Sequence, residues 1–213
     1  YSTFLQRAYD QLIHDIVVQD LDILLAIDRA GIVGADGETH QGIYDISFLR
    51  ILPKIILMTP SDELEMWKML STGQQYEGLA AVRYPRGYSQ GEDISLDDTT
   101  IEIGKSRIIQ KGSKIAYLVF GTLLNTVNKV AKKNGGTVVD MRFVKPIDED
   151  MIIDICNTHD YIFTVEDNVI LGGAGTAVSE VMAKYSLKNN LINIGVPDKI
   201  IPHGSQDEIL SEL

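Results

Sequence analysis

The sequence has few of the residues that mark several large classes of protein. One cysteine, Cys156, stands among 213 residues, which excludes an internal disulfide and a cysteine-based metal cluster and suits a reducing compartment. No apolar run approaches the roughly 20 residues that a membrane-spanning helix needs. Residues 1–10 lack the basic and then apolar pattern of a secretion signal.

Positive charge is also scarce. The sequence holds 19 Lys and Arg against 30 Asp and Glu, a formal net charge of -11. Such a surface repels nucleic acid and anionic membranes, so neither is an expected partner. A local group of arginines can still bind a small phosphorylated substrate against the overall sign. With 45% hydrophobic and 23% charged residues, the composition is typical of globular domains, and the length allows one large domain or two small ones.

Short apolar runs alternate with segments of helical periodicity along the whole chain, which predicts mainly parallel sheets covered by helices, an α/β fold. Strands are expected at residues 22–27, 54–58, 79–84, 115–120, 137–141, 161–165 and 191–194. Helices are expected at residues 3–18, 44–50, 60–73, 123–133, 148–157, 175–185 and 206–213.

Local signals set some of the boundaries. Thr3 and Gln6 fit a capping box at the start of the first helix, and Pro60 fits the first position of another. Residues 101–110 are expected to form a hairpin with the strand from Lys114 onward. The polar segment 88–100 is predicted to be a linker between two domains, 1–87 and 101–213.

The loop at residues 28–42 is the strongest candidate for a functional site. It follows a predicted strand, where ligands bind in open α/β sheets. It holds four glycines together with Arg29, Asp36, Glu38 and His40. Glycines allow a close approach of the backbone to a ligand, and histidine is the usual proton-transfer side chain near neutral pH. By residue types alone, a functional loop and a solvated surface loop are equally acceptable.

Other candidates favour structural roles. Gly172–Gly175 opens a helix after a strand, where a phosphate could bind, but its spacing lacks the dinucleotide pattern and favours close helix–sheet packing. Cys156 lies among isoleucines and is expected to be a packing residue. His159 and His203 are expected in exposed turns. No metal ligands are assigned within this chain.

Several motifs together resemble one family. The loop reads Asp-Arg-Ala-Gly-Ile-Val-Gly-Ala-Asp-Gly-x-Thr-His-Gln-Gly, which is similar to the signature of the 1-deoxy-D-xylulose-5-phosphate synthases. Further matches to that family are Tyr-Ser-Thr-Phe-Leu-Gln-Arg at 1–7, Met-Thr-Pro-Ser-Asp at 58–62, Arg-Tyr-Pro-Arg-Gly at 83–87 and Asp-Met-Arg-Phe-Val-Lys-Pro at 140–146. The resemblance covers the whole chain in order.

The resemblance implies a transferase that joins pyruvate to glyceraldehyde 3-phosphate with loss of carbon dioxide, for isoprenoid, thiamine and pyridoxal precursors. Thiamine diphosphate acts as its electron sink. This chain would hold most of the pyrimidine-binding domain, incomplete at its start, and the whole transketolase-type C-terminal domain. The family's Mg²⁺ motif and activating glutamate are expected upstream of Tyr1, so the isolated chain is expected to be inactive. Family members are homodimers, in the bacterial cytoplasm or in plant plastids.

The resemblance also implies roles for single residues. Phe4 and Arg7 match residues that contact the cofactor's aminopyrimidine. Tyr1, Arg29 and Arg86 match the anchors of the acceptor's phosphate, for which guanidinium groups are well suited.

Asp36 and His40 match catalytic residues around the reacting carbons. With Arg29 and Arg86, they are expected to converge on one cleft.

Other functions remain open on the sequence. A 2-oxoacid dehydrogenase β-type chain or a transketolase-type chain has a similar loop and C-terminal domain. A nucleotide-binding or flavodoxin-like module built on Gly172–Gly175 is an alternative of another class, as is a dimerisation module.

Overall fold

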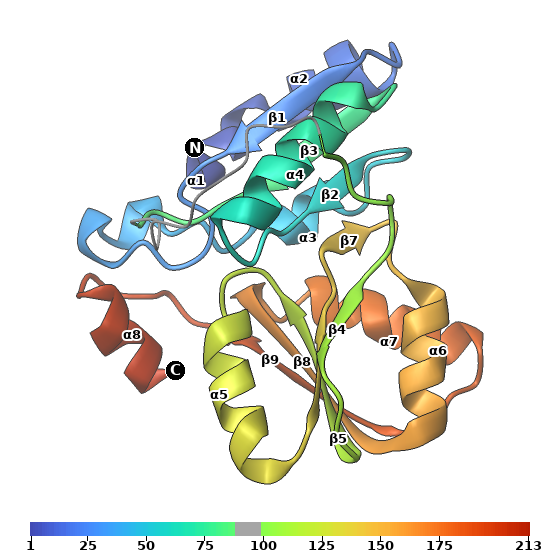
Figure 1. Cartoon of the computed structure of the whole chain (residues 1–213). Helices are drawn as coiled ribbons and strands as arrows, with labels where there is room; N and C mark the ends of the chain where they lie inside the picture. The colour runs from blue at the N-terminus through green and yellow to red at the C-terminus, as the bar shows by residue number, and fades with distance from the viewer. Residues whose placement is uncertain (88–98) are drawn as a thin grey trace.

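Two sheets, one above the other, form the frame of the molecule (Figure 1). The computed structural model describes residues 1–87 and 99–213. The first sheet has four strands in the order β1-β3-β2-β7, and the second has five in the order β4-β6-β5-β8-β9. Both are mainly parallel and carry helices on their faces, which confirms the predicted two-domain α/β class. The predicted linker lies almost entirely outside the described residues.

The first sheet comes mostly from the N-terminal part of the chain. Its strands are β1 (Ile23–Ile27), β2 (Ile56–Met58), β3 (Leu79–Arg83) and β7 (Phe143–Lys145). The first three are parallel neighbours around β3, and β7 adds antiparallel to β2. β7 was not predicted, and it lies in the part of the chain assigned to the second domain. The two halves therefore share a sheet.

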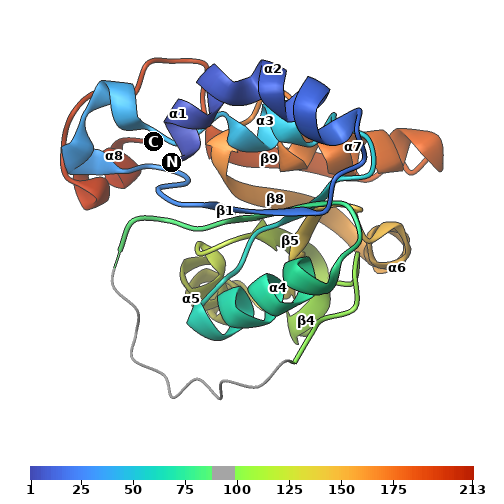
Figure 2. The ribbon, with the colours of Figure 1, turned by 90° about the horizontal axis from the view of Figure 1, so that it is seen from above.

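Helical segments cover both faces of this sheet. They are α1 (Ser2–Leu5), η1 (Gln6–Ala8), α2 (Tyr9–Gln11), the π-helical η2 (Leu12–Val17), α3 (Asp45–Leu49) and α4 (Glu63–Gln75). From above, the N-terminal segments and α4 lie on opposite sides of β1 (Figure 2).

Two predicted helix starts are wrong. Thr3 lies inside α1, where its hydroxyl donates to the Thr39 carbonyl, and the N-cap is Tyr1 without a side-chain cap. Pro60 precedes α4, because the carboxylate of Asp62 accepts the Glu65 N–H at 2.8 Å and caps the helix there.

The second sheet has the expected strand–helix alternation. Its strands are β4 (Arg107–Gln110), β5 (Lys114–Phe120), β6 (Thr137–Asp140), β8 (His159–Val169) and β9 (Asn190–Val196). Its helices are α5 (Leu124–Asn134), α6 (Glu149–Thr158) and α7 (Ala174–Lys184), and α8 (Gln206–Glu212) ends the chain. On β5, Leu118 belongs to the core that includes α6 and α7, whereas Tyr117 and Val119 pack with α5. This alternation is the period-two pattern of a strand buried on both faces.

The predicted hairpin between residues 101–110 and β5 is wrong. β4 pairs antiparallel with β6, because β5 already has parallel neighbours, β6 and β8, on its two edges. His159 is also not in an exposed turn. It is 9% exposed at the start of β8, with a ring nitrogen 2.7 Å from the Thr137 hydroxyl. The exposed position of His203 and the buried position of Cys156 are confirmed.

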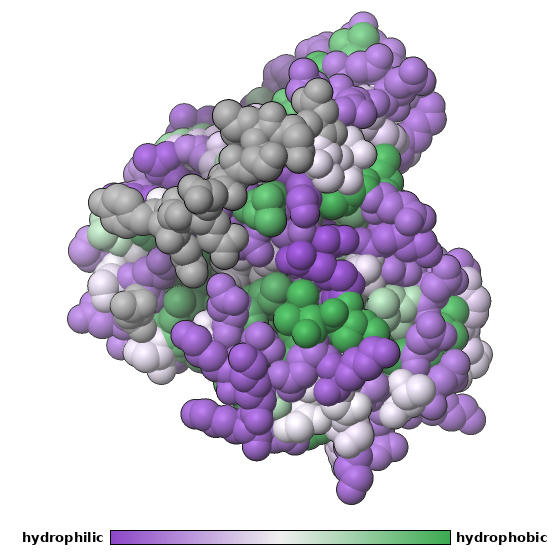
Figure 3. Space-filling model, viewed as in Figure 1, coloured by the Kyte–Doolittle hydropathy of each residue, from purple (hydrophilic) through white to green (hydrophobic). Residues whose placement is uncertain are grey.

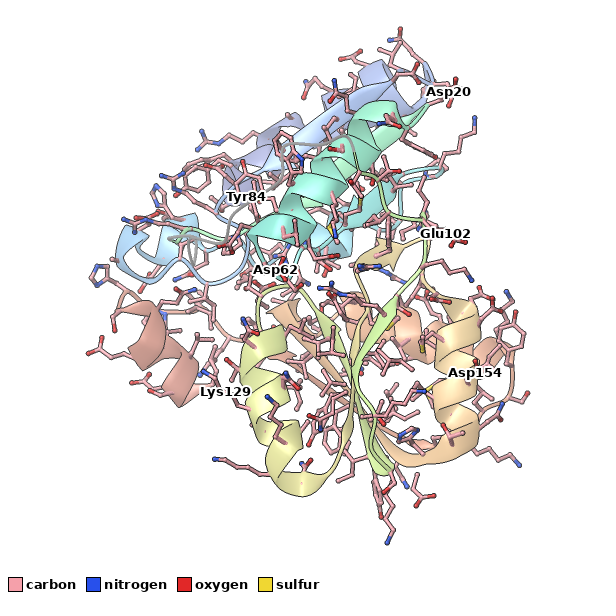
Figure 4. All side chains as sticks on the ribbon, viewed as in Figure 1. Asp20, Asp62, Tyr84, Glu102, Lys129 and Asp154 are labelled. Carbon is pink, nitrogen blue, oxygen red and sulfur yellow. The ribbon has the colours of Figure 1, made fainter. Side chains whose placement is uncertain are left out.

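Charged side chains join the two halves of the molecule at the start of α4, beside Asp62 (Figure 4). Arg142 holds the buried Glu65 by two hydrogen bonds of 2.8 and 3.0 Å. Arg107 contacts Glu65 at 2.9 Å and the buried Asp140 at 3.0 Å. Burial, first of all, raises the pKa of Asp140, and Arg107 opposes that rise. A buried carboxylate needs such partners, so this network fixes how the two sheets sit together.

The surface is mainly hydrophilic in the view of Figure 3, with apolar residues reaching it near β4, where Ile108 is 41% exposed. Within residues 1–87 and 99–213, β1 has β3 as its one hydrogen-bonded neighbour. Val18, Leu21 and Ile51 are exposed apolar residues of the same half. No helix in the described part of the chain is long and apolar enough to cross a bilayer.

Candidate functional site

Two neighbouring strand ends bring the predicted site residues together. β1 and β3 are parallel, and Ile27 at the end of one pairs with Arg83 at the end of the other. Arg29 follows β1 by two residues and Arg86 follows β3 by three. The Tyr84 carbonyl accepts the Ala30 N–H at 2.9 Å and keeps the two segments side by side (Figure 4). Both arginines therefore leave the same edge of the sheet, where ligands bind in such folds.

Asp36 lies between these arginines. Its Oδ1 is 2.7 Å from Nη1 of Arg86, and its Oδ2 is 3.5 Å from Nε of Arg29. The Tyr1 hydroxyl donates to the same Oδ2 at 3.2 Å. Burial and then the negative charge of Asp36 raise the pKa of Tyr1, which keeps this phenol protonated as a donor. We call these four residues the anion cluster.

A group of rings continues from the anion cluster. The Tyr1 ring lies 4.7 Å from that of Phe4 and 5.7 Å from that of His40, and Phe4 meets His40 edge to face at 5.2 Å. The Arg7 guanidinium lies 5.3 Å above the Phe4 ring, and that of Arg29 lies 4.8 Å above the Tyr1 ring. We call Tyr1, Phe4, Arg7 and His40 the ring cluster. All seven predicted site residues thus lie in two adjoining groups.

The loop 28–42 carries three of these residues, Arg29, Asp36 and His40. It has little regular secondary structure, but hydrogen bonds hold it in place. Gly31 and Gly42 form a bridge of two backbone hydrogen bonds, 2.7 and 2.8 Å long, which closes its base. Two 3₁₀ turns follow one another at the tip, η3 (Gly34–Asp36) and η4 (Glu38–His40). Beneath it in Figure 1 lies α8, whose Gln206 side chain donates to the Ile32 carbonyl at 2.9 Å. The C-terminal segment therefore supports a loop of the first half.

A buried ionic group that was not predicted from the sequence lies under the loop. Arg83 is 3% exposed and donates to Asp45 at 2.7 and 3.1 Å, to Asp167 of β8, and to the Gly42 carbonyl at 3.3 Å. Burial by itself would lower the pKa of Arg83, but Asp167 and Asp45 outweigh it and raise that pKa. The sequence does contain a signal for this buried ion pair, since the otherwise apolar strand Leu79–Arg83 ends in a charged residue.

A side chain of the protein itself occupies the start of α7, beside the glycine segment 172–175. Glu166, 2% exposed, accepts the N–H groups of Ala174 and Gly175 at 2.7 and 2.8 Å. A Cβ at Gly173 would lie 2.3 Å from its Oε2. Burial raises the pKa of Glu166 to about 7, although the two N–H donors favour its charged form. The carboxyl group of Glu166 thus occupies this helix start, which supports the packing interpretation over a nucleotide site.

Phe4 is the residue of the ring cluster best placed for a flat cofactor. Phe4 is 36% exposed and lies between Arg7 and His40. A ligand at this position would therefore contact an aromatic ring and two polar side chains at once. That combination fits a polar heterocycle. Among the described residues, no group of three or more His, Cys, Asp or Glu side chains is placed to hold a metal ion.

Family comparisons agree with this geometry. The pattern described as "Transketolase, pyrimidine binding domain" matches residues 1–90, and "Transketolase, C-terminal domain" matches residues 104–213, more than half of the chain.

The chain is also similar to curated proteins named 1-deoxy-D-xylulose-5-phosphate synthase. Identity is 56% over 213 residues with that of Pasteurella multocida (strain Pm70) and 52% with that of Vibrio campbellii (strain ATCC BAA-1116). Each match covers 100% of this chain and 34% of the relative, so the chain spans about a third of their length. The resemblance read from the motifs is confirmed. Transketolase-type and dehydrogenase-type alternatives are not favoured.

One solved structure, "Split gene transketolase, inactive beta4 tetramer", matches with a TM-score of 0.88 and 24% identity. The match covers 100% of this chain and 69% of that one, and it supports the fold.

Proposed function

The chain belongs to the family defined by the transketolase pyrimidine-binding and C-terminal domains, and we propose that it is the part of a 1-deoxy-D-xylulose-5-phosphate synthase that holds the acceptor substrate. The proposed enzyme joins pyruvate to glyceraldehyde 3-phosphate with loss of carbon dioxide, for isoprenoid, thiamine and pyridoxal precursors. The observation that carries this is the convergence of Arg29, Arg86 and Tyr1 beside an exposed aromatic ring.

The cationic and phenolic members of the anion cluster, Arg29, Arg86 and Tyr1, are proposed to bind the acceptor's phosphate. Two guanidinium groups and a phenol offer several N–H and O–H donors on one side, which fits the oxygens of a phosphate. Arg86 is 49% exposed and Arg29 37% exposed, so a small ligand can reach both. The phosphate would thereby hold the aldehyde at a fixed distance from the ring cluster, and orientation of this kind contributes to catalysis.

The ring cluster is proposed to hold thiamine diphosphate. Phe4 would stack on its aminopyrimidine, with Arg7 beside it. The bound cofactor supplies the carbanion stabilisation that this condensation needs. We propose that its diphosphate and Mg²⁺ are held by parts of the enzyme outside this chain.

His40 is proposed to handle a proton at the acceptor. The Thr39 hydroxyl lies 2.9 Å from Nδ1 of His40, which orients the ring. His40 would give a proton to the aldehyde oxygen as the new carbon–carbon bond forms, the general-acid role for which an imidazole is suited near neutral pH.

A cytoplasmic homodimer is proposed as the assembly, with domains at 1–87 and 101–213 and a linker at 88–100. Open sheet edges and exposed apolar patches are usually covered by another part of a protein. The edge of β1 left unpaired among the described residues and the exposed side chains of Val18, Leu21 and Ile51 therefore favour contact with the rest of the enzyme or with a second subunit.

An acceptor comparison tests the proposed function. The full-length enzyme is supplied with pyruvate, thiamine diphosphate and Mg²⁺, and with glyceraldehyde 3-phosphate, a lipoyl domain or another sugar-phosphate acceptor in turn. Formation of deoxyxylulose phosphate with the first acceptor alone is expected. Turnover with a lipoyl domain would reassign the chain to the dehydrogenase type.

A further inference from the structure

We propose that Asp36 is a built-in competitor for the acceptor's phosphate, and that it keeps monoanionic carboxylates out of the phosphate site. The inference rests on the proposed function and deepens it. It assigns a specificity role to a residue that the family resemblance linked to the reacting carbons.

The contacts of Asp36 are those that a phosphate would need. Its carboxylate accepts hydrogen bonds from Nη1 of Arg86 at 2.7 Å and from the hydroxyl of Tyr1 at 3.2 Å, and it lies 3.5 Å from Nε of Arg29 as an ion pair without a hydrogen bond. A carboxylate and a phosphate present similar oxygens to a guanidinium group. The same donors cannot serve both groups at full strength, so an entering phosphate must displace this carboxylate.

The charges decide which anions succeed. Arg29 also contacts the carboxylate of Asp28, so two guanidinium groups face two carboxylates. The net charge of these four side chains is therefore close to zero while Asp36 contacts the arginines. A monoanion would exchange one carboxylate for another with little gain. A phosphate near its dianionic form brings about twice the charge and more acceptor oxygens, and therefore displaces Asp36.

This discrimination has a use in the proposed reaction. Its other substrate, pyruvate, is a monoanionic carboxylate that must not fill the acceptor's place. Competition from Asp36 would raise the concentration of pyruvate needed to occupy the phosphate site formed by Arg29 and Arg86. Phosphorylated aldehydes would then bind there in preference to pyruvate. Specificity then depends on a repulsive element as well as on an attractive one.

The backbone around Asp36 allows the exchange. Asp36 ends the turn η3, and Gly37 follows with φ +91° and ψ 177°. A Cβ at Gly34 would lie 2.7 Å from the Gln206 nitrogen, so α8 holds that end of the turn in place. At Gly37 the nearest atom to such a Cβ is 3.9 Å away, on His203. The Asp36 side chain is 22% exposed, so it already borders solvent on the open side of the turn.

Asp36→Asn tests the proposal, because it removes the charge at nearly the same shape. Inorganic phosphate and then acetate are titrated calorimetrically into the full-length enzyme at pH 7.5. The expected result is tighter phosphate binding by about 2- to 10-fold, together with acetate binding that the parent protein lacks. Pyruvate should also become an inhibitor competitive with glyceraldehyde 3-phosphate.

Glu38→Gln is the matched control, since Glu38 is an exposed carboxylate in the next turn of the same loop. It should leave phosphate binding unchanged. Equally tighter phosphate binding in both variants would show that the effect comes only from the loss of a nearby negative charge, and would overturn the proposal. Weaker phosphate binding in Asp36→Asn would overturn it as well, by making Asp36 a ligand of the substrate.

Arg86→Ala separates this inference from the proposed function. If Arg86→Ala weakens phosphate binding while Asp36→Asn does not tighten it, only the competitor role of Asp36 fails. If Arg86→Ala has no effect on phosphate binding, the phosphate site itself is misplaced and the proposed function fails with it.

Discussion

Arg83 of β3 and Asp167 of β8 form an ion pair between the two sheets, directly under the loop that carries the candidate site. The same guanidinium binds Asp45 and the Gly42 carbonyl, and Asp167 packs against Gly31, where a Cβ would lie 2.3 Å from Oδ2. Gly31 and Gly42 are the two residues that close the base of the loop. This buried arginine therefore couples the second half of the molecule to the site, in addition to the contact that Gln206 of α8 makes with the loop.

Arg83→Met is expected to destabilise the protein by about 3–5 kcal/mol, because it leaves the fully buried Asp45 without its cationic partner. Urea unfolding followed by circular dichroism measures the change. Arg7→Met, on an exposed side chain, is the control and should stay within about 0.5 kcal/mol. A loss below 1 kcal/mol for Arg83→Met would contradict a structural role for the ion pair.

Arg86→Ala is expected to raise the KM for glyceraldehyde 3-phosphate in the full-length enzyme and to leave the KM for pyruvate almost unchanged. A charge-assisted hydrogen bond is worth about 1.5–3 kcal/mol, which corresponds to roughly a 10- to 150-fold change. Steady-state kinetics with each substrate varied in turn provide the measurement, and pyruvate serves as the internal control. Equal changes in both KM values would indicate a role in folding or cofactor binding instead.

His40→Ala is expected to lower turnover, by about 10²- to 10⁴-fold if it removes a general acid, with a smaller effect on KM. Single-turnover and steady-state rates with both substrates saturating measure this. His14→Ala, at an exposed position on the N-terminal helical segment, is the control and should keep the parent rate. An unchanged turnover number in His40→Ala would remove this residue from the catalytic group.

Glu166 is expected to make stability depend on pH. Its pKa is raised from 4.5 to about 7 in the folded protein, mainly by burial, so the folded state holds the proton more tightly than the unfolded state. The resulting stabilisation is fully present below pH 4.5 and is lost as the pH rises through 7. The free energy of unfolding should therefore fall over this range, by about 3 kcal/mol at most.

Glu166→Gln should remove that fall, because glutamine does not titrate. Urea midpoints from pH 4.5 to 8 for the parent and the variant measure the difference. Glu102→Gln, on an exposed carboxylate, should follow the parent curve. Parallel curves for the parent and Glu166→Gln would show that the two backbone N–H donors keep Glu166 charged throughout.

The order of strands and helices was largely predictable because it depends on local periodicity. β1, β3, β5 and the helices of the second half lie within a few residues of their expected ranges. The convergence of Arg29 and Arg86 was also predictable, since neighbouring parallel strands end at one edge of a sheet. Both inferences use contacts that are close in sequence or fixed by strand direction.

The partners of β4 and β7 could not be found in this way. β4 crosses to β6, and β7 leaves the second half to extend the first sheet. Short strands carry little period-two signal, and their neighbours depend on which edges remain unpaired once the rest has folded. The same holds for Asp36, whose sequence position identified a polar loop residue but not its contact with two arginines.

The sequence by itself determined the fold class, the family and the group of side chains that form the candidate site, because periodic patterns and motifs are properties of neighbouring residues. Only the tertiary structure decided which charges meet. Arg83 joins Asp45 and Asp167, Arg142 joins Glu65, and Glu166 fills the start of α7, across separations of up to 84 residues. Burial makes each of these pairings strong, and burial is set by the packing of the whole chain.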